Sequence, residues 1–112
     1  MNRYMIDGII RDAQAGKRVL CVIPSREIQR TITQLETAAG ITLLRRSHGQ
    51  ELISFGSGGA ISFAVPAHGP MRGIHAEIVV IDDVYYRDQM FDLHDTLKAC
   101  VAASGGEIIT YT

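Results

Sequence analysis

The feature that most constrains this chain is an unbroken aliphatic run at residues 78–81, Ile-Val-Val-Ile, followed by Asp82 and Asp83. Four consecutive branched side chains cannot alternate between a buried and a solvated face, so the run predicts a strand buried on both faces. The acidic pair then falls at the carboxyl end of the strand, where open α/β sheets bind ligands. Two interpretations are open: a pair of ligand-binding carboxylates, or a polar pair that ends the strand and begins a turn.

Helical and strand patterns alternate along most of the 112 residues. Residues 2–15 carry apolar side chains at helical spacing, and Gly16 is suited to end that helix because glycine readily takes a positive φ. Residues 19–23 form a second continuous apolar strand. An amphipathic helix follows, with Ser25 as its expected N-cap and Gly40 just after its end.

The middle of the chain has a pattern typical of a β-hairpin. Residues 52–55 and 61–65 alternate apolar with small or polar side chains on the two sides of a glycine-rich stretch, residues 56–59. A short strand at residues 41–44 precedes them. A glycine-rich stretch can also bind phosphate, but this one follows no strand-to-helix junction and carries no attached lysine, so a turn is favoured.

Two further elements complete the pattern. A third helix is expected from residue 88 and residues 107–112 form a final strand rich in β-branched side chains. Helices that separate apolar strands imply right-handed parallel crossovers. The predicted fold class is therefore α/β, with one domain over residues 1–112: a three-layer sandwich that has a mostly parallel small sheet plus a β-hairpin. The expected buried face of the third helix comprises Met90, Leu93, Leu97 and Val101.

Composition limits the class of protein. With 46% hydrophobic and 21% charged residues the chain can bury one core, and its apolar runs are too short to span a membrane. No signal-peptide pattern is present, so we expect a cytoplasmic protein. The net charge of -1 is uneven, since residues 1–56 carry eight Lys/Arg against five Asp/Glu and residues 57–112 carry three against seven. This asymmetry favours self-association or a charged partner, although a solvated surface is the simpler explanation.

Cysteine and histidine positions do not predict a metal site. Cys21 lies in an apolar strand and Cys100 in a helical pattern, so both are expected to be small buried hydrophobes, without a disulfide framework. The four histidines have no paired ligand spacing with these cysteines, which argues against zinc.

Three segments together resemble a known family. Residues 17–27, an apolar strand that meets Pro, Ser and Arg, look like the helicase segment that follows the first ATPase helix. Residues 61–83 are similar to large terminase subunits of tailed phages, in which an extended strand, an Arg-Gly segment and the Walker B strand come in this order. Residues 108–112 resemble the strand that ends in a coupling motif. The chain is therefore interpreted as a degenerate, truncated RecA-like P-loop ATPase core, similar to that of phage large terminases or superfamily 2 helicases.

The resemblance implies roles for individual residues. Asp82 matches the Walker B acid that holds Mg²⁺, and it is the residue that we consider if any metal binds. Asp83 matches the position that orients the attacking water, where the family usually has glutamate; aspartate is one methylene shorter, enough to misplace that water. Arg72 resembles the arginine before the Walker B strand, which contacts phosphate or a neighbouring subunit. A plain surface arginine is the other interpretation of Arg72.

The chain lacks Walker A, Gly-x-x-x-x-Gly-Lys-Ser/Thr, whose amides and lysine cradle the phosphates. The single Gly-Lys pair, Gly16 and Lys17, lies at the end of a predicted helix, where the dipole disfavours phosphate. By the resemblance, the family's P-loop would precede Met1. We therefore predict no catalytic residues and no cofactor, with Mg-ATP bound only if a partner supplies the P-loop.

The family's strand order, 5-1-4-3-2, gives a further expectation. The strands kept here match its second, third and fourth, which are neighbours and can still form a small sheet. The strand at residues 107–112 would then be an exposed edge, with Ile108, Thr110 and Thr112 as the expected interface residues. Such an edge pairs with another chain or a second copy, or is covered by the chain's own helix.

Three hypotheses of function follow. The first is a non-catalytic, regulatory module of phage or prophage origin that binds a protein partner or itself. The second is an ATPase component of a split site whose Walker A comes from another chain. The third is a nucleic-acid-binding accessory protein that uses the local basic cluster of Arg45, Arg46 and His48, for which a solvated turn is the competing interpretation. A standalone enzyme built on Asp82 and Asp83 is disfavoured because no third carboxylate or histidine is convincingly placed.

Overall fold

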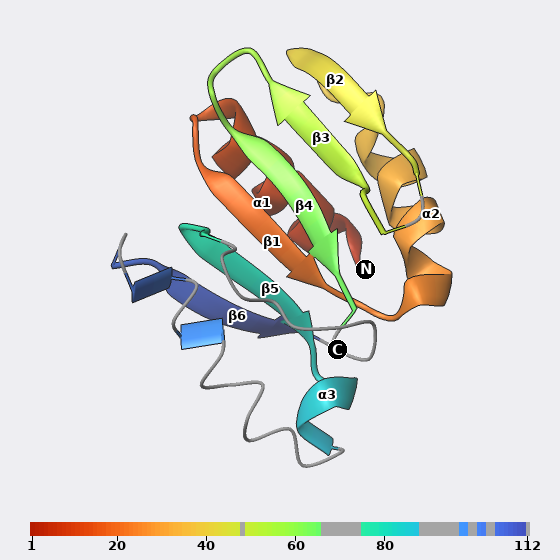
Figure 1. Ribbon diagram of the computed structural model, residues 1–112, viewed down its shortest axis with the longest axis vertical. Helices are drawn as coiled ribbons and strands as arrows, with labels where there is room; N and C mark the ends of the chain where they lie inside the picture. Colours follow the sequence, from red (N-terminus) through yellow and green to blue (C-terminus); the bar gives the residue numbers. More distant parts are fainter. Residues whose placement is uncertain (48, 66–74, 88–96, 99–100, 103–104, 112) are drawn as a thin grey trace.

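The computed structural model describes residues 1–47, 49–65, 75–87, 97–98, 101–102 and 105–111. Leu97, Lys98, Val101 and Ala102 are helical. The other elements, shown in Figure 1, are α1 (Arg3–Gln14), β1 (Arg18–Val22), α2 (Ser25–Leu35), β2 (Ile41–Arg45), β3 (Leu52–Phe55), β4 (Ala60–Ala64), β5 (Ile78–Asp82), α3 (Val84–Arg87) and β6 (Glu107–Tyr111).

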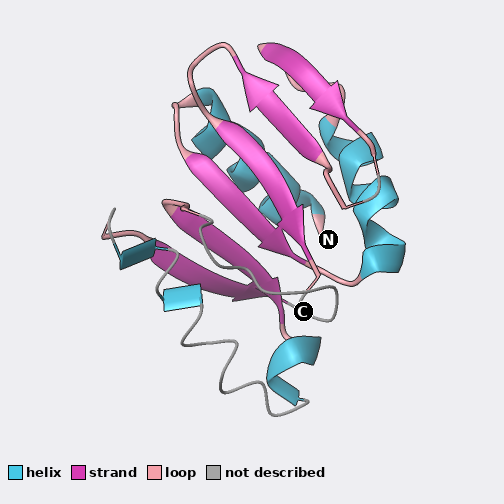
Figure 2. Ribbon diagram, viewed as in Figure 1, coloured by secondary structure: helices cyan, strands magenta, loops and turns pink. Residues whose placement is uncertain are grey.

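All six strands belong to one sheet of order β2-β3-β4-β1-β5-β6 (Figure 2). Strands β4, β1, β5 and β6 are parallel, whereas β3 is antiparallel to both β2 and β4. The predicted α/β class and the hairpin are confirmed. The sheet is nevertheless mixed, because the hairpin is part of it: β4 pairs with β1 from Arg18 opposite Ala60 to Val22 opposite Ala64.

Helix α1 ends next to Gly16 as predicted, and its N-cap is Asn2, which the sequence pattern did not identify. The Asn2 side chain accepts a hydrogen bond from the Met5 amide at 2.9 Å and so caps the first turn. At the other end Gly16 has φ 95°, its amide donates to the Ala13 carbonyl, and the Lys17 amide donates to the Asp12 carbonyl. This pair of bonds is a Schellman motif, which needs a left-handed residue at the position of Gly16.

Helix α2 differs from its prediction at both ends. Ser25 is its first residue, not its N-cap; Pro24 holds the cap position and no side chain caps the helix. The helix ends at Leu35, its last buried residue, well before Gly40. Gly40 instead has φ 90° and leads the chain into β2, so its left-handed conformation makes a strand entry and not a helix end.

The alternation of side chains divides the core between the two faces of the sheet. On one face, α1 and α2 pack against residues that include Val19, Cys21 and Val80. On the other face, Leu97 and Val101 pack against residues that include Leu20, Val22, Val79 and Ile81. The prediction that 78–81 is buried on both faces is therefore confirmed, since all four residues are at most 4% exposed. Of the expected third helix, Met90 and Leu93 lie outside the described residues.

Candidate functional site

The carboxyl ends of the parallel strands bring Asp82 and Tyr111 together, because these residues are opposite each other in the β5–β6 register. Asp82 is half-buried, and its Oδ1 accepts a hydrogen bond from the amide of Val84 at 3.0 Å. This bond makes a turn of the Asx kind, from which α3 begins. Asp83 is also half-buried, and its amide donates to the Tyr111 carbonyl at 2.9 Å. The geometry therefore gives Asp82 a turn-forming role.

Two tyrosines shape the electrostatics of this edge. Burial raises the pKa of Tyr111, and the negative charge of Asp82 raises it further. The hydroxyl of Tyr111 is buried and has no hydrogen-bond partner among the described residues. Burial and then Asp82 also raise the pKa of Tyr85, which Arg26 partly opposes. The charge of Asp82 thus acts on both tyrosines and favours their neutral hydroxyls.

The described residues near Asp82 do not form a metal-binding cluster. Within the described residues, no three His, Cys, Asp or Glu side chains are placed to hold a metal ion. Cys21 is fully buried, and burial raises the pKa of its thiol to about 12. The prediction of a small buried hydrophobe is confirmed for Cys21, while Cys100 lies outside the described residues.

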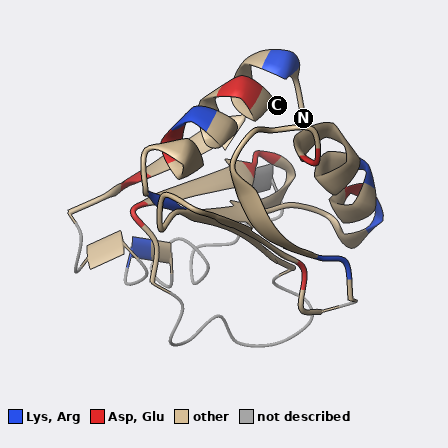
Figure 3. Cartoon of the chain, turned by 90° about the horizontal axis from the view of Figure 1, so that it is seen from above, with Lys and Arg blue, Asp and Glu red and all other residues tan. Residues whose placement is uncertain are grey.

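The predicted basic cluster is not a group of unpaired cations. The Arg46 guanidinium contacts a carboxylate oxygen of Glu36 at 2.5 Å and the Gln29 side chain at 3.2 Å. Gln29 also donates to the Arg46 carbonyl at 3.2 Å, so these groups fasten the end of β2 to α2. Arg45 is exposed on β2, and His48 lies outside the described residues. Lys/Arg and Asp/Glu are interspersed along the helices in the view of Figure 3.

The glycine-rich stretch is a hairpin turn, as predicted. The Ser57 hydroxyl donates to the Ala13 carbonyl at 2.6 Å and accepts from the Gly59 amide at 3.1 Å. Because these groups already bond within the chain, they favour a structural turn over a phosphate loop. The other predicted phosphate contact, Arg72, lies outside the described residues.

Strand β6 forms one end of the sheet, opposite β2 (Figure 1). The Glu107 amide donates to the Glu77 carbonyl at 3.0 Å, and the Tyr111 carbonyl accepts from the Asp83 amide. Backbone groups of a strand point alternately to its two sides, so Glu107, Ile109 and Tyr111 bond to β5. The amides and carbonyls of Ile108 and Thr110 must then point away from β5. Both belong to the predicted interface set, whereas Thr112 lies outside the described residues.

The other end of the sheet is less regular. The register between β2 and β3 shifts between Ile41 and Leu43, as at a β-bulge. Arg45 is exposed near the end of the strand, and Leu43 is 43% exposed. Irregular register and charged side chains are devices that protect edge strands from pairing. In contrast, the five pairs of β5 with β6 run without a shift.

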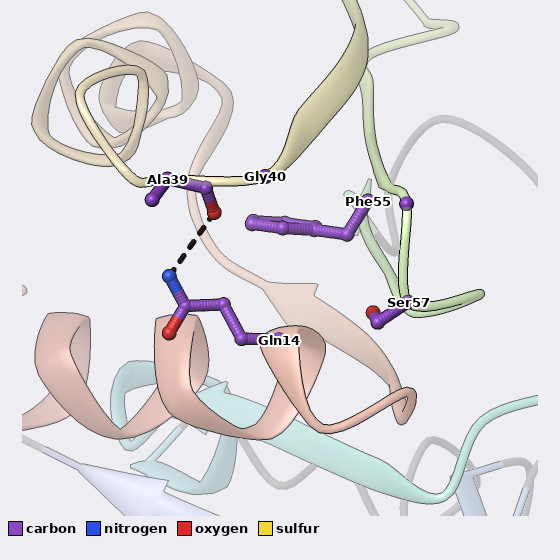
Figure 4. A pocket seen from close by; sticks show the side chains of 6 residues that line it. Gln14, Ala39, Gly40, Phe55 and Ser57 are labelled. Atoms are coloured by element: carbon purple, nitrogen blue, oxygen red, sulfur yellow. Dashed lines mark hydrogen bonds between the residues drawn. The ribbon is translucent and has the colours of Figure 1, made fainter.

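A hollow of about 400 Å³, which no sequence pattern predicts, lies at the opposite end of the parallel strands. The Phe55 ring points from β3 toward Gly40, and the Gln14 side chain below it donates to the Ala39 carbonyl at 3.1 Å (Figure 4). The described residues that line the hollow carry no charged side chain; they are Gln14, Ala39, Gly40, Phe55, Gly56 and Ser57.

Comparisons with protein-family models, with curated proteins and with solved structures find no match to this chain. Among the described residues, no helix is long and apolar enough to cross a membrane.

Proposed function

We propose that this chain is a non-catalytic, regulatory module derived from a RecA-like ATPase core, and that it acts by binding a partner strand along β6. The observation that carries the proposal is the direction of the Ile108 and Thr110 backbone groups, which point away from β5. An end strand whose backbone groups point outward from the sheet is a template for pairing with another chain. Main-chain hydrogen bonds would supply affinity, and the side chains beside them would supply specificity.

The strand order supports descent from such a core. Strands β1, β5 and β6 are parallel neighbours. That is the order expected when only the second, third and fourth strands of the family's sheet are kept. The packing of Leu97 and Val101 on the face opposite α1 and α2 supports the finer proposal of a three-layer sandwich. The family's phage setting is part of the same proposal.

The non-catalytic assignment rests on the sequence and on Asp82. The sequence has no Walker A, and the Asp82 carboxylate already accepts a bond from the Val84 amide. A split-site ATPase is the second candidate because the resemblance implies that the family's P-loop strand lies beside the equivalent of β6, which is an end strand of the sheet here. A partner that adds a P-loop strand there would bring phosphate-binding groups to the side of Asp82.

Amide hydrogen exchange in dilute protein tests the proposed function. We expect the Ile108 and Thr110 amides to exchange much faster than those of Ile109 and Tyr111, which face β5. Equal protection of all four amides in a protein that is monomeric at that dilution would mean that the chain covers its own edge, and would overturn the proposal.

Calorimetric titration with Mg-ATP separates the two candidates. We expect no binding at millimolar nucleotide by the isolated chain. Binding that Asp82→Ala abolishes and Asp82→Asn weakens would overturn the non-catalytic assignment and point to a phosphate site built within this chain.

A further inference from the structure

We propose that the strand that pairs with β6 is the β6 of a second copy, antiparallel to the first and centred on Ile109. The inference rests on the proposed function, because it names the partner of the same edge. It assigns Ile108 and Thr110 as the residues that bond across the interface.

The hydrogen-bond pattern is self-complementary in this register. Antiparallel pairing about Ile109 places Ile108 of one copy opposite Thr110 of the other, and the reverse. All four of these residues direct both backbone groups toward the partner, so each pair exchanges two hydrogen bonds. Every outward amide and carbonyl of Ile108 and Thr110 is then satisfied, which a register shifted by one residue would prevent.

Charge and side-chain shape favour the same arrangement. Glu107 is the single charged residue of β6. Antiparallel pairing separates the two Glu107 side chains to opposite ends of the interface, each opposite a Tyr111. The central pairs join β-branched residues, Ile108 with Thr110 and Ile109 with itself, which suit cross-strand contact.

The opposite edge explains why pairing would stop at two copies. A two-fold dimer uses the same strand on both subunits and leaves the two β2 strands at the ends of the joined sheet. The shifted register of β2 and its exposed Arg45 oppose further strand addition. The expected product is a closed dimer with a continuous sheet, not a fibre.

Proline substitution provides the first test. The Thr110 amide points away from β5 in the parallel β5–β6 pattern, so Thr110→Pro should disrupt the dimer while leaving the β5–β6 bonds in place. Thr110→Ala keeps the amide and is the matched control. By light scattering after gel filtration, we expect wild type and Thr110→Ala to have twice the chain mass of 12.3 kDa. We expect Thr110→Pro to raise the dimer dissociation constant about tenfold or more, since two hydrogen bonds are lost per dimer.

A disulfide test does not depend on tolerance of proline. In the proposed register Ile109 faces Ile109 as a non-hydrogen-bonded pair, at a Cα separation of about 4.5 Å that suits a disulfide. With Cys100→Ser as background, Ile109→Cys should form a crosslinked dimer under mild oxidation. Thr110→Cys is the control, because it faces Ile108 and should not crosslink to itself.

The outcomes separate this inference from the proposed function. A monomeric wild type whose Ile108 and Thr110 amides exchange rapidly would overturn the second copy as partner and leave the edge open for a different chain. A dimer whose dissociation constant is the same in Thr110→Pro as in Thr110→Ala, or that crosslinks equally through Thr110→Cys, would place the contact elsewhere and overturn the inference. A monomer with all four amides protected would overturn both proposals.

Discussion

Asp82 and Tyr111 lie opposite each other at the carboxyl ends of β5 and β6, and each has a distinct role in the turn that follows. The Asp82 carboxylate accepts from the Val84 amide, and the Tyr111 carbonyl accepts from the Asp83 amide. The two bonds fix the exit of the chain from the sheet. This pair therefore connects the edge strand β6 to the turn that begins α3.

Asp82→Ala should lower the free energy of unfolding by about 1 kcal/mol, because the Val84 amide loses its acceptor. Asp82→Asn keeps a side-chain oxygen and should retain most of that stability. Urea unfolding of the two variants beside wild type measures the difference. Equal losses in both variants would show that the carboxylate charge, and not the turn, is what matters.

Tyr111→Phe should leave the protein as stable as wild type or stabilise it by up to about 1 kcal/mol, since the buried hydroxyl has no partner in the described structure. Tyr85→Phe is a suitable comparison because Tyr85 is only half-buried. A marked loss of stability in Tyr111→Phe would reveal a bridging water or ion at the hydroxyl.

The protein should become less stable above about pH 9. Burial raises the pKa of Cys21 from 9.0 to about 12, so between these values the unfolded thiol ionises while the folded one keeps its proton. The stability conferred by the neutral thiol is thus complete below pH 9 and is lost as pH rises, by about 1.4 kcal/mol per pH unit. Tyr111, whose pKa is also raised, adds to the loss at higher pH. We expect the free energy of unfolding, measured by urea titration at a series of pH values, to fall less steeply with pH in Cys21→Ala than in wild type.

Two glycines should not tolerate a side chain. A Cβ at Gly59 would lie 2.0 Å from the Ala13 carbonyl oxygen, and one at Gly106 would lie 1.8 Å from that of Glu77. Gly59→Ala and Gly106→Ala should therefore each lower the free energy of unfolding by about 3 kcal/mol or more, because the backbone must move to make room for the methyl group. Gly8 meets nothing within 4 Å and lies in α1, so Gly8→Ala should stabilise by up to about 1 kcal/mol. Thermal melts of the three variants provide the comparison.

DNA should not bind appreciably even at low salt, because Arg46 is already engaged by Glu36 and Gln29. Fluorescence anisotropy with labelled single- and double-stranded DNA measures this. Strong binding that weakens steeply with salt, and that Arg45→Ala reduces, would restore the basic cluster as a nucleic-acid site.

Local chemistry accounts for the parts of the fold that the sequence predicts. The aliphatic run at 78–81 has no polar face to expose, and Gly16 supplies the left-handed residue that ends α1. The aliphatic run and Gly16 each determine the conformation of residues that are close to them in the chain. The hairpin between β3 and β4 is likewise visible, because its turn and its alternation are contiguous in the chain.

The remaining features depend on partners far away in the chain. Nothing near Ala60 indicates that β4 will pair with β1, and nothing near Arg46 identifies Glu36 as its partner. The hollow beside Phe55 forms where three separate segments meet. At the candidate site, the apolar run predicts that Asp82 ends a strand. The run does not tell whether the Asp82 carboxylate binds a metal ion or accepts a hydrogen bond within a turn. The bond from the Val84 amide favours the turn.

The position of β1 in the sheet also bears on how this protein is made. β1 is synthesised before both of its neighbours in the sheet, β4 and β5, which come much later in the chain. A nascent chain that has emerged only through β3 would hold a strongly apolar segment with neither flanking strand present. Pairings between such distant segments form slowly and leave the chain prone to aggregation until they close. During synthesis, the apolar side chains of β1 would therefore need protection from aggregation until β4 and β5 have been synthesised.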